Sequence, residues 1–156
     1  MATTLSACAT LLARAGIRHH LDAEQQALRA VFVTRDYENP RGEKLAIVQI
    51  ETPDDGARCR AMIARAFRAA DDPAAACFAA CRLAADTPLV GVECDADGTA
   101  LRLVVETVVE DGRLTERQLL AMLDSVVVAA ETWHAGLRAA AGRGRPPRPR
   151  AKRTAA

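Results

Sequence analysis

The sequence predicts an α+β fold, because segments with the period of an amphipathic helix alternate with pairs of segments rich in β-branched residues. Two strands are expected within residues 27–37 and 43–52, on either side of the stretch ENPRG. The Pro and Gly of that stretch suit a hairpin connection. The strongest helix signal lies in residues 114–138. These observations indicate one domain in which helices pack on an antiparallel sheet.

The first helix is expected to begin near the N-terminus. Thr3 or Thr4 can cap it, and Gly16 can end it. Its apolar positions share one helical face: Leu5, Cys8, Leu12 and Ala15.

A second helix is predicted over residues 71–86. Asp72 is its natural N-cap, and Pro73 stands at the first helical position, where its missing N–H leaves no bond unmade. Two further strands are then expected within residues 87–112, joined by a tight turn at the stretch DADG.

The last helix begins with a capping box formed by Thr115 and Gln118, and Leu114 is spaced to pack on Leu119 as a hydrophobic staple. Apolar residues then recur at helical spacing. This pattern predicts a buried stripe made of Leu119, Met122, Leu123, Val126, Ala130, Trp133 and Leu137.

Residues 57–66 fit two structures. Their alanines and arginines favour a helix by propensity. However, Arg58 and Arg60 alternate with Cys59 and Ala61, which is the period of a strand.

Charge divides the chain into two parts. Residues 142–156 contain five Arg and one Lys and no acid, so subtracting +6 from the net charge of +1 leaves −5 for residues 1–141. Because the last segment has no apolar residues that could order it, we expect a domain over 1–141 and a disordered basic tail over 142–156.

The sequence contains no convincing catalytic or metal-binding motif. Cys77 and Cys81 share a helical face and His19 adjoins His20, but a structural zinc site needs four ligands, usually in tight pairs. Gly98 stands at the fourth position of DADG, whereas a calcium loop of the EF-hand type has its Gly at the sixth. We therefore expect no enzyme, no metal and no cofactor.

The expected location is the cytoplasm. The N-terminal stretch lacks the basic region of a signal peptide, and no segment approaches the ~20 apolar residues of a membrane span. The five cysteines lie in apolar patterns, so we expect reduced thiols.

The second half of the chain resembles the YbjN domain family, which shares the type III secretion chaperone-like fold. The resemblance lies in a helix that runs into TPLVGVECDADG, in the turn and cap of VEDGRLTERQLLAML, and in a long last helix that ends in the pair Trp133–His134. It extends over roughly residues 3–138. Family members often have a Pro shortly after that His, where this chain has Ala135 and Gly136.

The resemblance implies a strand at residues 57–66. The expected order is then helix, three-strand meander, helix, two-strand hairpin and helix, with the helices mainly on one face of the sheet. It further implies a non-catalytic bacterial protein-binding domain, chaperone-like or regulatory, that pairs as a homodimer and has an unidentified protein partner. The expected dimer contact on the middle helix consists of Ala75, Ala79 and Arg82.

The basic tail supports an alternative function, nucleic-acid binding. Arg143-Gly144-Arg145-Pro146 matches the core of an AT-hook, whose arginines enter the narrow minor groove. The remaining candidate contacts are Arg148, Arg150, Lys152 and Arg153. A solvated tail that aids solubility explains the same residues.

Overall fold

The computed structural model describes residues 3–68, 78, 80–82, 84–85, 87–95, 98, 100–109 and 113–143, without the side chains of 68 and 136–143. The N-terminal half forms α1 (Leu5–Arg14), β1 (His19–Asp22), β2 (Ala27–Val33), β3 (Leu45–Glu51), the 3₁₀ turn η1 (Asp54–Gly56) and β4 (Arg58–Arg68). The C-terminal half forms β5 (Gly91–Cys94), β6 (Ala100–Val108) and α3 (Glu116–Arg143). Between β4 and β5, the described residues 78, 80–82 and 84–85 are helical.

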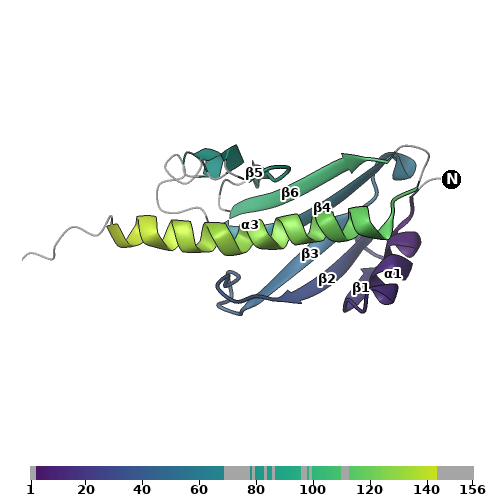
Figure 1. The fold of residues 1–156 in the computed structure, drawn as a ribbon, viewed down its shortest axis with the longest axis horizontal. Coiled ribbons are helices and arrows are strands. Elements are labelled where there is room, and N and C mark those ends of the chain that lie inside the picture. The colour runs from purple at the N-terminus through teal and green to yellow at the C-terminus, as the bar shows by residue number, and fades with distance from the viewer. Residues whose placement is uncertain are drawn as a thin grey trace, which may run out of the picture.

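The six strands form one antiparallel sheet in the order β1-β2-β3-β4-β6-β5. The helix α3 crosses the sheet over β3, β4 and β6, while α1 packs beside it on β1 and β2 (Figure 1). Since α1 and α3 also contact each other, both lie on the same face. The expected α+β fold, with helices packed mainly on one face of an antiparallel sheet, is confirmed.

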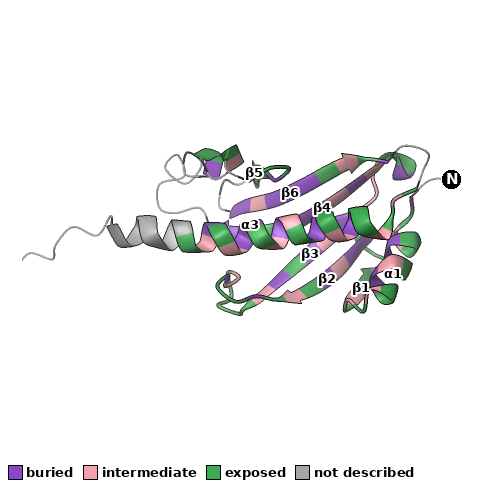
Figure 2. Cartoon of the chain, in the orientation of Figure 1, coloured by how far each residue is buried: buried purple, intermediate pink, exposed green. Residues whose placement is uncertain are grey.

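A single apolar core fills the space between the sheet and these two helices (Figure 2). In β2 and β3, alternate residues point into it, as the pleat of a strand requires. In β3 these residues are Ala46, Val48 and Ile50. The predicted stripe of α3 is buried from Leu119 to Trp133, and the side chain of Leu137 lies outside the described residues.

The helix caps are those that the sequence predicts. Thr4 caps α1, since its hydroxyl accepts a hydrogen bond from the Ala7 N–H at 3.1 Å. Gly16 follows with a φ of +70°, a conformation that glycine adopts at no steric cost. At the start of α3, Thr115 N–H donates to Gln118 Oε1 and Gln118 N–H donates to Thr115 Oγ1, which completes the capping box.

Within residues 57–66, all but Ala57 belong to strand β4, which begins at Arg58. Cys59, Ala61 and Ile63 of β4 are buried in the core, while Arg58 and Arg60 point to the opposite face. A helix would have distributed these arginines around its circumference. The two-residue period therefore outweighs the helical propensity of alanine and arginine here.

The strand β1 adds a sixth strand that the sequence did not predict. It pairs His19 with Ala30 and Asp22 with Ala27, and only the turn of residues 23–26 separates it from β2. Its four residues include no β-branched side chain and no regular alternation of burial. Pairing with the edge of β2, rather than local propensity, makes this segment a strand.

The cysteines of α1 and β4 meet inside the core. Cys8 and Cys59 are both fully buried free thiols, whereas Cys81 and Cys94 are exposed. A hydrogen bond with the Cys8 thiol, together with burial, raises the pKa of Cys59. Cys59 therefore keeps its proton, as expected of a small apolar core residue.

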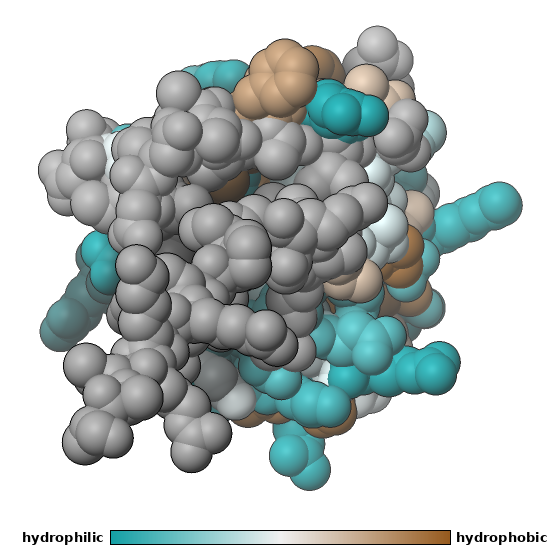
Figure 3. Space-filling model, turned by 90° about the vertical axis from the view of Figure 1, so that its left-hand side faces the viewer, coloured by the Kyte–Doolittle hydropathy of each residue, from teal (hydrophilic) through white to brown (hydrophobic). Residues whose placement is uncertain are grey.

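Two sequence predictions fall largely outside the described residues. The caps Asp72 and Pro73 of the middle helix are among these, and so are residues 144–156 of the expected tail. Figure 3 views the molecule from the end toward which α3 runs, and both hydrophilic and hydrophobic side chains of described residues are exposed there. In the described part of the chain, no helix is long and apolar enough to cross a bilayer.

Candidate protein-interaction face

The candidate site is the face of the sheet opposite α1 and α3, which no helix covers in the described part of the chain. Because successive side chains of a strand alternate between faces, each strand that buries one set of residues under the helices presents another set here. In β2, Leu28 and Ala30 point into the core, and Arg29, Val31 and Val33 point to this face. We call it the helix-free face.

Apolar side chains lie together at one part of this face. Val31 pairs with Ile47 and Val33 pairs with Leu45 across the β2–β3 ladder. Val31, Ile47 and Val33 are 40%, 45% and 85% exposed, and Leu45 is half-buried. These four residues form what we call the apolar strip. Isolated exposed apolar residues are common on proteins, but a contiguous group is a feature of interaction surfaces.

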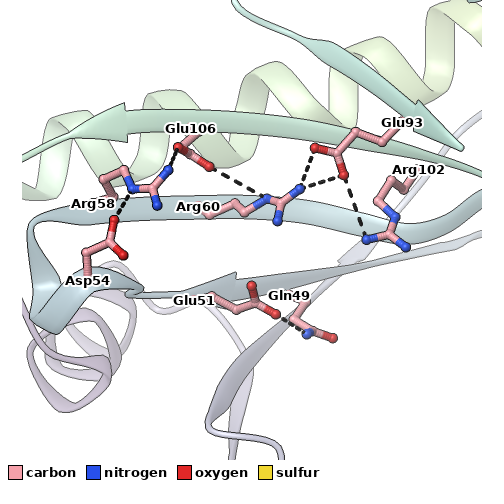
Figure 4. Close-up of polar contacts among 8 residues, drawn as sticks. All are labelled: Gln49, Glu51, Asp54, Arg58, Arg60, Glu93, Arg102 and Glu106. Carbon is pink, nitrogen blue, oxygen red and sulfur yellow. Dashed lines mark hydrogen bonds and ion pairs between the residues drawn. The ribbon is translucent and has the colours of Figure 1, made fainter. Parts of the chain in front are cut away.

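Charged side chains cover another part of the helix-free face, on β4, β5 and β6. Arg58 contacts Asp54 at 2.5 Å and Glu106 at 2.7 Å (Figure 4). Arg60 donates to both carboxylate oxygens of Glu93, at 2.5 and 2.6 Å, and Glu93 also lies 3.7 Å from Arg102. We call these six residues the ion-pair lattice.

The ion-pair lattice carries no net charge, and it covers apolar side chains beneath it. It contains three arginines and three acids, so its formal charge is zero. Met62 and Val104 pair across β4 and β6 within it, and they are 4% and 7% exposed although they are not part of the helix-side core. Long arginine side chains cover apolar surface while their charged ends stay in solvent. This part of the face therefore offers less to a partner than the apolar strip does.

A groove of about 600 Å³ adjoins the apolar strip where β3 and β4 separate. The β3–β4 ladder has only three pairs, from Gln49–Met62 to Glu51–Arg60. Farther along, β4 shifts register against β6 between Ile63 and Phe67, which leaves Ala64 and Arg65 exposed. Such a bulge bends a strand locally. The apolar part of the lining includes Leu45, Ile47, Ile63 and Ala64.

Tyr37 closes the groove on its core side. Its ring is fully buried and contacts Phe67 edge-on at 5.8 Å, and its hydroxyl donates to the Ala66 carbonyl at 2.9 Å. Burial raises the pKa of Tyr37 to about 12, so the hydroxyl stays protonated and continues to donate. The β2–β3 loop is thereby fixed to β4 across the opening.

Glu131 of α3 fixes the same loop from the helix side. Its carboxylate accepts hydrogen bonds from the backbone N–H groups of Arg35, Asp36 and Tyr37, each at 2.6 Å. Burial by itself would raise the pKa of Glu131, but these three donors, together with nearby His134, lower it. The β2–β3 loop, which borders the groove on the helix-free face, is thus held in place by α3 on the opposite face of the sheet.

The structure leaves most of the sequence-predicted site residues untested. Arg82 is exposed, but Ala75 and Ala79, the other members of the expected dimer contact, lie outside the described residues. Arg143 is the last residue of α3, and the other tail residues are not described. No group of three or more His, Cys, Asp or Glu side chains that could hold a metal occurs among the residues described; Cys77 is not one of these.

Sequence reasoning identified a free sheet face but not the residues on it. A signal was present, because the run Val31-Phe32-Val33 is apolar in both phases of a strand, so one phase must point away from the core. The ion-pair lattice left no such signal, since its partners lie up to 48 residues apart. Nor did the contacts of Glu131, whose carboxylate accepts hydrogen bonds from loop N–H groups that lie 94–96 residues away in the chain.

Comparison with solved structures decides the fold. The chain is similar to the crystal structure of YbjN from E. coli, a candidate transcription regulator, with a TM-score of 0.55 and 16% identity over 88% of this chain and 92% of that one. The fold is that of YbjN. This similarity confirms the YbjN-like fold that the resemblance in the sequence implied. No protein-family model and no curated protein matches the sequence.

Proposed function

We propose that this YbjN-like domain is a non-catalytic, cytoplasmic protein-binding module, chaperone-like or regulatory, that holds its partner on the helix-free face. The observation that carries the proposal is the apolar strip of Val31, Val33, Leu45 and Ile47, on a face that the described helices leave open. Burying such surface against a partner is favourable by about 25 cal/mol per Å². The neighbouring ion-pair lattice supplies a polar border, as is usual around an interface core.

Replacement of Ile47 with Glu tests this proposal. The change places a charge at the middle of the apolar strip, so recovery of partner proteins from a bacterial lysate should fall at least about tenfold. Val128→Glu is the matched control, since Val128 is 50% exposed on α3, on the other side of the sheet. Quantitative mass spectrometry of proteins captured by the wild type and by each variant provides the measurement.

Equal losses for both variants, or no loss for Ile47→Glu, would contradict the proposed face. We further propose that the protein pairs as a homodimer, as the resemblance implies. Light scattering of the wild type should give twice the 16.6 kDa chain mass. A monomer mass at a protein concentration of tens of micromolar would contradict the proposed homodimer.

A second candidate function is regulation through nucleic acid. Two observations favour it: the similar E. coli protein is a candidate transcription regulator, and residues 142–156 carry six cations and no acid. A flexible segment of this charge neutralises several phosphates, so its affinity for a duplex should fall steeply with salt.

Truncation after Ala141 separates this candidate from the first. Full-length protein should bind an AT-rich duplex at low salt, and the truncated chain should not. Replacing Arg143 and Arg145 together should remove any preference for AT-rich over GC-rich duplex, whereas replacing Arg148 and Arg150 should lower affinity for both. Electrophoretic mobility shifts over a salt series measure these effects, and absence of binding by the full chain would exclude the candidate.

A further inference from the structure

The groove beside the apolar strip combines an apolar lining with excess positive charge. Its lining includes Arg29, Arg41 and Arg65 and a single acid, Glu43, which gives a net formal charge of +2. Glu43 already accepts a hydrogen bond from Asn39 Nδ2 at 2.9 Å. The charge surplus at this site contrasts with the neutral ion-pair lattice on the rest of the face.

Two of the three arginines are available to a ligand. Arg29 lies 3.3 Å from Asp22 and also contacts the side chain of Gln25. Arg41 and Arg65 are exposed, and neither guanidinium pairs with a carboxylate within the part of the chain that is described. A guanidinium binds a carboxylate through two parallel hydrogen bonds, so each of these side chains can receive one acid.

The shape of the groove favours an extended chain. It follows the opening between β3 and β4, where residues Leu45–Val48 have no partner in β4 and the register of β4 shifts after Ile63. A strand presents alternate side chains to opposite sides, so an extended segment can place apolar residues on Leu45, Ile47 and Ala64 and direct intervening acids to the arginines.

We propose that this groove binds an extended peptide segment in which apolar and acidic residues alternate. This inference rests on the proposed function and specifies the chemistry of the partner. It excludes the chain's own basic tail as the occupant, because six cations would be repelled by a groove of net charge +2. It also disfavours single-stranded nucleic acid, since the one aromatic ring in the lining, Tyr37, is fully buried and cannot stack on a base.

Fluorescence polarisation with synthetic peptides of about eight residues tests the proposal on the full chain. A fluorescein-labelled peptide alternating Val and Asp should bind at least about tenfold more tightly than one alternating Val and Lys or one alternating Ser and Asp. The affinity for the Val–Asp peptide should also fall as salt is raised, because ions screen exposed charge pairs. Equal binding of the three peptides, or binding abolished by an equal concentration of oligothymidylate, would overturn the proposal.

Two double substitutions of arginine test whether the peptide binds in the groove. R41Q/R65Q should weaken the Val–Asp peptide about tenfold, whereas R113Q/R117Q removes the same charge from exposed positions at the start of α3 and should leave affinity within about twofold. Unchanged circular dichroism would show that both variants fold. If R41Q/R65Q binds the peptide like the wild type while Ile47→Glu still loses its lysate partners, the groove proposal fails and the proposed function stands. If Ile47→Glu loses nothing, the proposed function itself fails.

Discussion

Replacing Trp133 with Ala should lower the free energy of unfolding by about 4 kcal/mol, the largest stability effect that we expect from a single substitution. The Trp133 ring is fully buried and stacks on Phe67 with a centroid distance of 6.4 Å. Its Nε1–H donates to Thr87 Oγ1 at 3.1 Å. Truncation therefore leaves a large cavity where α3, β4 and the segment before β5 meet. A loss of this size is a large fraction of the stability of an ordinary domain.

Urea unfolding monitored by circular dichroism measures this effect. Trp133→Phe retains an aromatic ring and loses the hydrogen bond to Thr87, so it should cost clearly less than Trp133→Ala. Thr132→Ala is the surface control, because Thr132 is exposed on the same turn of α3. A change below about 1 kcal/mol for Trp133→Ala would mean that α3 does not pack on the sheet in this way.

Replacing Glu131 with Ala should lower the free energy of unfolding by about 2 kcal/mol, since it removes three hydrogen bonds to a charged acceptor. Because these hydrogen bonds are partly exposed to solvent, we expect the loss of stability to be smaller than the sum for three fully buried hydrogen bonds. Glu24→Ala is the matched control. It also removes one carboxylate charge, but from a side chain that is exposed in the β1–β2 turn.

The contribution of Glu131 should depend on pH in a defined direction. Its pKa is lowered in the folded protein, so the carboxylate is favoured by folding. The stability that it supplies is fully present above the unfolded pKa of about 4.3 and is lost as pH falls through the lower folded value. The stability difference between wild type and Glu131→Gln should therefore be largest near neutral pH and shrink in acid. A difference that grows below pH ~4 would contradict the hydrogen-bonding geometry.

Local sequence patterns predict the elements whose signals are complete within a few residues. The capping box of Thr115 and Gln118 and the stripe from Leu119 to Trp133 are of this kind, because each depends only on spacing along one helix. The strand at residues 57–66 needed the family resemblance as well, since propensity and period disagreed.

Features that depend on how strands pair, rather than on a local pattern, could not be read from the sequence. The strand β1 forms because it pairs with β2, and His19–Asp22 alone has no strand pattern. The groove arises where the β3–β4 ladder stops after three pairs, and no local pattern determines where two strands separate. Sequence reasoning could therefore predict an uncovered sheet face but not the positive groove or the neutral lattice that divide it.

Amide hydrogen exchange of the protein with and without a captured partner tests the central claim most directly. Amides exchange slowly where a bound partner protects them from solvent. If the helix-free face holds the partner, protection should increase in β2 and β3, around Val31, Val33 and Ile47, and should stay unchanged along Glu116–Ala135 of α3. Protection confined to α3, with β2 and β3 unaltered, would contradict the account.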